Sequence, residues 1–302
     1  MLASLKSVTR CYKTSSSLAN SFYTPFRMVA ATKNITTAAC LIIGDEVLNG
    51  KIKDTNSAYF AKFCFDHGIA VKHIAVVPDE ESDIVETIQR MASRYDFIVT
   101  SGGIGPTHDD ITYESLAKAF GLPVALDEEL KERMYTLGKR RIDPANHEAV
   151  AAQLRMAIIP SGPNVETIYI DPAGLWVPVV AIDAKVHILP GVPQLFQRML
   201  NGLVPTLSAR FPQTDALLER FYVATRLRES EMAPYLTRLQ HEVDPLGIKI
   251  GSYPHMSIGV NTVSIIGKAA HKDKLREIVK DVEANLQGHE VSKEEEEKQS
   301  ST

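Results

Sequence analysis

The sequence predicts an α/β protein: a three-layer α/β/α domain with a mostly parallel sheet over residues 35–208, then a small α+β domain over residues 215–290. Three observations support this fold class. From Thr37 onward, short apolar runs alternate with segments of helical periodicity, the pattern of strand–helix–strand units with right-handed crossovers. Glycines follow several of these runs, where turns are expected. The 302 residues are 44% hydrophobic and 23% charged, which is enough apolar material for a sizeable core.

The first domain is expected to begin with a fully apolar strand that ends at Gly44. A helix capped by Asp54 or Thr55 follows, and Gly68 ends it. Further strands are expected at Ile69–Val77, Phe97–Thr100 and Val186–Leu189. A hairpin is expected at Val165–Ile170 and Val177–Ile182, with its turn at 171–174. Further helices are expected at Asp83–Ser93, Thr112–Phe120 and Glu128–Gly138, and from the Pro190–Pro193 turn through Leu207.

A boundary is expected at Ala209–Thr214, which carries Pro212 and little apolar content. The unit after it has a normal size for a small domain. Its expected elements are strands at Phe221–Arg226, Ile248–Gly251 and Ser257–Ile266, and helices at Glu229–His241 and Lys272–Leu286.

The two ends differ in charge from the body of the chain. No Asp or Glu precedes Asp45, and the start holds basic residues with a Ser/Thr-rich run. This composition is typical of a mitochondrial transit peptide, with a disordered basic leader over residues 1–34 as the alternative. Initiation at Met28 would produce a cytosolic form. Residues 291–302 carry an acidic run and are expected to form a disordered, solvated tail.

Composition excludes several classes of protein. No apolar run approaches the roughly 18 residues that span a bilayer, so no membrane partner is expected. The formal net charge of −4 does not favour nucleic acid. The three cysteines are odd in number and lack metal-ligand spacing, which argues against a disulfide framework and a zinc module.

The most informative segment is the glycine-rich loop, residues 101–110, between a buried strand and the helix at Thr112. Ligands bind in open α/β sheets beyond the carboxyl ends of the strands. Glycines allow close backbone approach, and a helix N-terminus attracts anions. The loop is therefore predicted to bind phosphate. The residues expected to do so are Ser101, Gly102, Gly103, Gly105, Thr107 and Thr112.

Asp109 and Asp110 in this loop would repel a phosphate unless a divalent cation lay between them. Oxygen ligands suit Mg²⁺ or Mn²⁺ bound jointly with substrate phosphates. These two residues are therefore predicted to be catalytic and to bind the metal. In the alternative interpretation, the glycines form a tight turn and the two acids stabilise the helix dipole.

Other polar residues follow neighbouring strands and are expected at the same sheet edge. Asp45, Glu46 and Asp54 are further candidate metal ligands, although Asp54 equally suits a helix cap. Asn56 and the Pro190–Gly191 turn are candidate substrate contacts. Asp79 also follows a strand, where it equally suits the first turn of a helix.

These motifs resemble the MoaB/Mog molybdopterin-binding domain, in the form found in CinA-type proteins and in the N-terminal half of animal FAD synthases. The resemblance rests on 44–50 (GDEVLNG), 54–56 (DTN), 101–110 and 189–193 (LPGVP), and runs from about Thr37 to Leu207. Residues 250–254 (IGSYP) resemble the small domain that follows in those proteins. Residues 171–176 depart from the turn of bacterial CinA proteins and are closer to the FAD-synthase-like form.

The resemblance implies a metal-dependent hydrolase that cleaves FAD or ADP-ribose and releases AMP, with Mg²⁺, Mn²⁺ or Co²⁺ as cofactor. Two alternatives stay open. One is a molybdopterin adenylyltransferase, for which Asp110 and Asp79 match the family acids and molybdopterin is the ligand. The other is a flavin- or nucleotide-binding module without turnover. By analogy with the fold, a homo-oligomer is expected. Neither the amidohydrolase domain of CinA nor the nucleotidyltransferase domain of FAD synthase is expected in this sequence.

Overall fold

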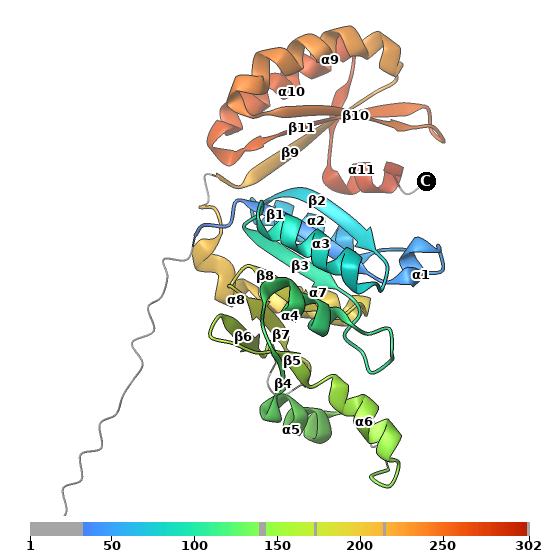
Figure 1. The fold of residues 1–302 in the computed structure, drawn as a ribbon. Coiled ribbons are helices and arrows are strands. Elements are labelled where there is room, and N and C mark those ends of the chain that lie inside the picture. Colours follow the sequence, from blue (N-terminus) through green and yellow to red (C-terminus); the bar gives the residue numbers. More distant parts are fainter. Residues whose placement is uncertain (1–32, 139–142, 172–173, 214–215, 301–302) are drawn as a thin grey trace, which may run out of the picture. The chain divides into compact units, whose positions relative to one another are not determined.

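The computed structural model describes residues 33–138, 143–171, 174–213 and 216–300 (Figure 1). The leader prediction therefore lies outside the described residues, apart from Lys33 and Asn34, as does Met28. Residues 33–213 form an α/β unit around a six-stranded sheet in the order β2-β1-β3-β8-β7-β6. Its strands are β1 (Thr37–Ile43), β2 (Ala70–Val77), β3 (Phe97–Ser101), β6 (Val165–Ile168), β7 (Val179–Ile182) and β8 (Val186–Leu189).

The sheet is mostly parallel, as predicted. Strand β1 pairs in parallel with β2 and β3, and β3 pairs in parallel with β8. Strands β7 and β6 then add in antiparallel fashion and form the predicted hairpin, each two residues shorter than expected. The predicted turn at 171–174 lies partly outside the described residues, because 172 and 173 are not described.

Helices cover both faces of this sheet, which makes the predicted three layers (Figure 1). Alternate residues of β1 point to opposite faces: Cys40 and Ile42 belong to one core and Leu41 and Ile43 to the other. Helices α2 and α7 pack on the first core, and α3, α4 and α5 on the second. The helices are α1 (Asp45–Leu48), α2 (Asn56–Asp66), α3 (Glu81–Ala92), α4 (Thr112–Phe120), α5 (Glu128–Leu137), α6 (His147–Arg155), α7 (Pro193–Gly202) and α8 (Val204–Leu207), followed by the 3₁₀ turn η1 (Ser208–Arg210).

The elements of this unit that escaped prediction include the one-turn helix α1, strands β4 (Val124–Leu126) and β5 (Ile158–Pro160) and helix α6. Strands β4 and β5 have three residues each and pair across a long stretch of chain, so neither shows a local alternating pattern. Helix α6 contributes no fully buried residue, although Leu154 packs partly buried against the second core, so its apolar face is weak. Its start is nevertheless marked, because Asn146 accepts a hydrogen bond from the N–H of Ala149 at 3.0 Å.

Residues 216–300 form a second, antiparallel sheet in the order β10-β11-β9-β12 with its own hydrophobic core. Helices α9 and α10 contribute Met232 and Leu275 to that core. Helix α10 has the predicted bounds. Strand β9 begins three residues earlier than predicted, β10 ends four residues later, and β11 begins three residues later and ends two residues later. The elements are β9 (Leu218–Thr225), α9 (Glu229–Val243), η3 (Asp244–Leu246), β10 (Lys249–His255), β11 (Val260–Lys268), η4 (Ala269–His271), α10 (Lys272–Leu286), β12 (His289–Val291) and α11 (Lys293–Ser300).

The prediction of a disordered tail from residue 291 is wrong over the described residues, which form the end of β12 and helix α11. A capping box begins this helix: the Ser292 N–H donates to the Glu295 carboxylate at 2.8 Å, and the Glu295 N–H donates to the Ser292 hydroxyl at 3.2 Å. An argument from net charge overlooks this signal. None of the helices described is long and apolar enough to cross a membrane.

Candidate functional site

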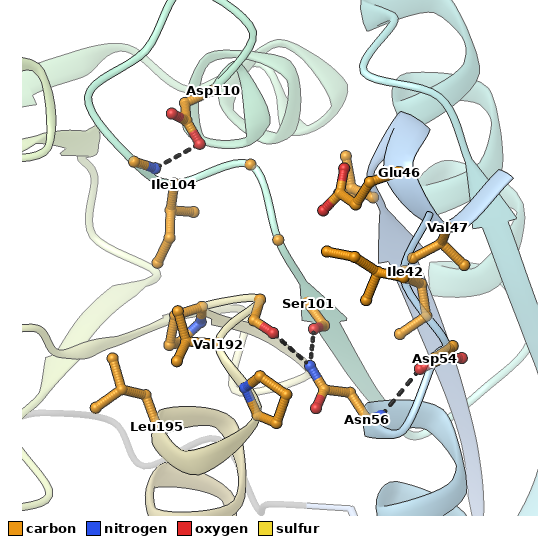
Figure 2. A pocket seen from close by; sticks show the side chains of 18 of the residues that line it. Ile42, Glu46, Val47, Asp54, Asn56, Ser101, Ile104, Asp110, Val192 and Leu195 are labelled. Atoms are coloured by element: carbon orange, nitrogen blue, oxygen red, sulfur yellow. Dashed lines mark hydrogen bonds between the residues drawn. The ribbon is translucent and has the colours of Figure 1, made fainter. Parts of the chain in front are cut away.

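A cavity of about 520 Å³ lies at the carboxyl edge of the parallel strands, within the size range of small-molecule sites (Figure 2). Its walls come from the segment between β1 and α2, from the glycine-rich loop after β3 and from the turn between β8 and α7. The end of α6 and the approach to β7 complete it through Met156, Trp176 and Val177. The cavity thus lies where the strand order predicts a ligand site.

Most of the predicted site residues lie in the lining of this cavity. Four do not, namely Asp45, Thr107, Asp109 and Thr112. Those that do are Glu46, Asp54, Asn56, Ser101, Gly102, Gly103, Gly105, Asp110, Pro190 and Gly191.

The glycine-rich loop follows a path that side chains would block. Gly102 has φ of +112°, and a Cβ at this position would lie 2.1 Å from the carbonyl oxygen of Ile43. Gly103 has φ of +64°, and its Cβ would lie 2.3 Å from the hydroxyl of Thr112. Both positions therefore need glycine, because the backbone conformation and the contacts each exclude a side chain.

Asp110 holds the loop together from within. Its carboxylate accepts a hydrogen bond from the N–H of Gly105 at 2.6 Å (Figure 2). It also accepts bonds from the N–H of Thr107 at 2.8 Å and from the Thr107 hydroxyl at 2.5 Å. Part of the alternative interpretation, a tight turn, is thus present in the structure. Asp110 also lines the cavity.

Thr112 has a different place from the one predicted. Its side chain is fully buried, its hydroxyl donates to the carbonyl of Gly102 at 2.9 Å, and its N–H donates to the carbonyl of Gly103 at 2.9 Å. The start of α4 therefore closes the loop and is not exposed to the cavity. The helix N-termini that do line the cavity include that of α2, through Thr55 and Asn56, and that of α7, through Val192 and Pro193.

Two backbone donors in the lining are available to a ligand. Over the part of the chain that the structure describes, the N–H groups of Gly103 and Ile104 donate to no protein acceptor. Adjacent free N–H groups of this kind can bind an anion such as a phosphate.

Asn56 joins three of the cavity's walls. Its side-chain amide donates to the Ser101 hydroxyl at 2.9 Å and to the carbonyl of Gly191 at 2.8 Å (Figure 2). Both amide hydrogens are thereby used, so Asn56 has no donor left for the phosphate that the sequence assigned to it. Its Oδ1 is buried and accepts no bond from the described residues.

The acids of the site lie in different surroundings. Asp54 accepts from the N–H groups of Asn56 at 2.9 Å and Ser57 at 3.0 Å, which is the helix-start alternative left open by the sequence. Glu46 lies over Gly44, where a Cβ would be 2.9 Å from its Oε2. Asp79 accepts the N–H of Asp45 at 3.0 Å.

The pKa values reflect these surroundings. Burial raises the pKa of Asp79, and the neighbouring carboxylates of Asp45, Glu46 and Asp109 raise it further. The Thr107 hydroxyl lowers the pKa of Asp109, with smaller contributions from its own backbone and from His108 and Arg155.

These acids provide only part of a metal site. Among the residues described, no three His, Cys, Asp or Glu side chains converge as a metal site. Magnesium needs fewer protein ligands, because it keeps waters and is often held by one or two carboxylates together with substrate phosphates. The lining contains three acidic residues, namely Asp110, Glu46 and Asp54.

Two charged residues at the site had no signal in the sequence. Lys53 lines the cavity and is the residue before Asp54, where a lysine is unremarkable. Arg155 ends α6 and donates to the carbonyl oxygens of Thr107 and Asp110. Only the fold brings it to a loop more than forty residues earlier in the chain.

Comparison with known proteins identifies the family. A family model described as "Probable molybdopterin binding domain" matches residues 39–209. The chain belongs to this family. A second model, "FAD synthase, middle domain", matches residues 219–295, the region of the antiparallel sheet. The resemblance noted in the sequence is thereby confirmed.

Relatives of this molybdopterin-binding-domain protein include a "Probable FAD synthase" of Caenorhabditis elegans, 32% identical over 264 residues, covering 84% of this chain and 50% of the relative. A "CinA-like protein" of Myxococcus xanthus is 35% identical over 226 residues, covering 74% of this chain and 50% of the relative. The chain thus spans about half the length of these relatives. A crystal structure of CinA from Thermoplasma acidophilum, 31% identical, covers 57% of this chain and 99% of its own, with a TM-score of 0.49.

Proposed function

We propose that this protein is a metal-dependent hydrolase that cleaves a nucleotide diphosphate, FAD or ADP-ribose, and releases AMP. The observation that carries the proposal is the pairing, in one cavity, of free backbone donors at Gly103 and Ile104 with the carboxylate of Asp110. The free N–H groups suit the diphosphate. A carboxylate beside a bound diphosphate is favourable when a cation lies between them.

In this proposal Asp110 holds the metal together with Glu46 or Asp54, which line the same cavity. Asp45 and Asp109, outside the lining, are the weaker candidates. A bound divalent ion would neutralise the diphosphate and lower the pKa of its water. The protein's own groups orient the substrate, because the loop's N–H groups and the start of α7 fix the anion. The names of the relatives support a nucleotide-related activity.

The test is a product assay with the full chain. It is incubated with FAD, ADP-ribose or NAD, with Mg²⁺, Mn²⁺ or Co²⁺ or with a chelator, and AMP is measured. The proposal predicts AMP release that requires metal. AMP release in chelator, or none under any condition, would contradict it.

Asp110 needs a control, because it also builds the loop. Asp110→Asn removes both the carboxylate charge and acceptors for the loop. Thr107→Val removes one donor to Asp110 and leaves the carboxylate in place. If Asp110 holds the metal, Asp110→Asn raises the metal concentration needed for half-maximal activity about tenfold or more, and Thr107→Val lowers activity without that shift. Equal metal dependence in both variants would reduce Asp110 to a loop-building residue.

The second candidate is a molybdopterin adenylyltransferase, favoured by the family match over residues 39–209. It predicts a fluorescent pterin that copurifies with the protein and ATP-dependent adenylylation of that pterin. A non-catalytic module predicts nucleotide binding without product. The AMP assay separates the three.

Import into mitochondria remains a proposal based on the acid-poor start of the sequence. It is tested by fusing residues 1–34 to a fluorescent protein and locating the fusion in cells. A diffuse cytosolic signal would contradict it.

A further inference from the structure

The glycine-rich loop is held on its outer side by one arginine from a distant helix. The Arg155 Nη1 donates to the carbonyl oxygen of Thr107 at 3.0 Å, and its Nη2 donates to the carbonyl oxygen of Asp110 at 3.3 Å. The same Nη2 lies 3.9 Å from the carboxylate of Glu114 on α4. Arg155 is not part of the cavity lining, so it does not contact the space a ligand would fill.

These contacts pair several of the loop's polar groups. The Asp110 carboxylate accepts the N–H groups of Gly105 and Thr107, and Arg155 binds the carbonyls of Thr107 and Asp110. Among the loop residues whose N–H groups donate to no acceptor in the described part of the chain, Gly103 and Ile104 are those that line the cavity. Loss of the guanidinium would leave the carbonyls of Thr107 and Asp110 without this donor and would remove the ion pair with Glu114, which favours a different loop conformation.

The residue after Arg155 strengthens this connection. Met156 caps the C-terminus of α6 and lines the cavity. The end of α6 therefore contributes both a residue of the cavity lining, Met156, and the arginine that binds the glycine-rich loop, Arg155. Arginine suits this position because its two terminal nitrogens reach two acceptors at once, whereas a lysine ammonium is a point charge.

We infer that Arg155 is a positioning residue for ligand binding: it holds the glycine-rich loop in the conformation that presents the Gly103 and Ile104 N–H groups to a nucleoside diphosphate. The inference rests on the proposed function only for the chemistry of that ligand. The loop geometry itself is independent of whether hydrolysis follows.

The test compares three variants of the full chain. Arg155→Ala removes both hydrogen bonds to the loop carbonyls. Arg155→Lys keeps the positive charge and can form one of these two bonds. Glu114→Gln removes the ion pair on the far side and leaves both bonds to the loop. Affinity for ADP is measured by calorimetry, and amide hydrogen exchange is measured over residues 102–111. Each measurement is repeated with free guanidinium, which can replace the missing arginine side-chain group, at a concentration too low to denature the protein. It is also repeated with urea at the same concentration, because urea has a similar shape and no charge.

The inference predicts that Arg155→Ala weakens ADP binding about tenfold or more and speeds exchange in the loop, since two charge-assisted bonds are lost. Arg155→Lys should fall between wild type and alanine, and Glu114→Gln should resemble wild type. Guanidinium should restore the alanine variant and urea should not, a difference that a general loss of stability would not produce.

Unchanged loop exchange in Arg155→Ala would overturn the inference, as would equal effects of guanidinium and urea. If wild type does not bind ADP, the proposed function fails, while loop exchange and its rescue by guanidinium still decide the inference. If Arg155→Ala does not fold, loop exchange in Arg155→Lys is compared with that of the wild type instead. Loop exchange as slow as in wild type would then overturn the inference.

Discussion

The carboxylate of Asp110 and the backbone of Gly105 are in direct contact: the Gly105 N–H donates to Oδ1 at 2.6 Å, and a Cβ on Gly105 would lie 2.6 Å from Oδ2. Asp110, which the sequence predicts to be catalytic, thus also stabilises the conformation of the loop. Its two roles can be separated by experiment only because Thr107 donates to the same carboxylate and can be altered alone.

Gly102→Ala should abolish the loop's conformation. The new Cβ would lie 2.1 Å from the backbone oxygen of Ile43, which cannot move without disturbing β1. We expect a loss of about 3 kcal/mol in the free energy of unfolding, measured in urea, and loss of nucleotide binding.

The matched control is Gly121→Ala at the end of α4. Gly121 has φ of +65°, but a Cβ there would meet no atom within 4 Å. This variant should cost only the backbone strain, about 1 kcal/mol. Equal losses in the two variants would show that the contact with Ile43 is unimportant.

Asn56→Asp should open the cavity. The carboxylate cannot donate to the Gly191 carbonyl and places a charged acceptor against it, although the Ser101 hydroxyl can turn and donate to the carboxylate. We expect a loss of about 3 kcal/mol in the free energy of unfolding. In Asn201→Asp, where the amide bonds the exposed Tyr59 hydroxyl at 2.7 Å, the loss should stay below about 1 kcal/mol. If Asn56→Asp and Asn201→Asp lose the same stability, the two hydrogen bonds of Asn56 do not hold the cavity walls together.

His187 should make the protein sensitive to acid. Its ring is buried on β8, and burial lowers its pKa to about 4. The unfolded chain has the ordinary pKa of about 6.5 and binds a proton there first, so stability falls as pH drops from about 6.5 to 4. His187 should account for about 3 kcal/mol of that fall.

His187→Gln tests this, because glutamine keeps a donor for the carbonyl of Lys185, 3.2 Å from Nδ1, and does not titrate. Urea denaturation at about pH 7 and about pH 4.5 should show a smaller loss for the variant than for wild type. Identical losses would mean that another group causes the acid sensitivity.

The fold was predictable where local patterns coincide with burial. Helix α4 has the predicted bounds because an apolar stripe and the capping Gly121 mark it, and α10 shows its stripe as clearly. Helix α6 has no fully buried residue, and β4 is only three residues long, so both were missed. Their structure depends on contacts that no local window contains.

The candidate site was predictable as a place and less so in its details. The glycines of 102–105 and the strand before them indicated the loop, and the parallel sheet implied the shared edge. The sequence could not show that Thr112 faces inward, that both amide hydrogens of Asn56 are used, or that Arg155 reaches the loop. Each depends on how distant segments meet.

The most direct test of the central claim is where a diphosphate binds, because all three candidate functions use that step. ADP-ribose is titrated into isotope-labelled full-length protein, and the amide resonances are followed by NMR. The account predicts that the Gly103 and Ile104 amides shift most, in the direction of stronger hydrogen bonding, and that Gly102→Ala abolishes the shifts. Binding of ADP-ribose that leaves these two amides unchanged would contradict the account.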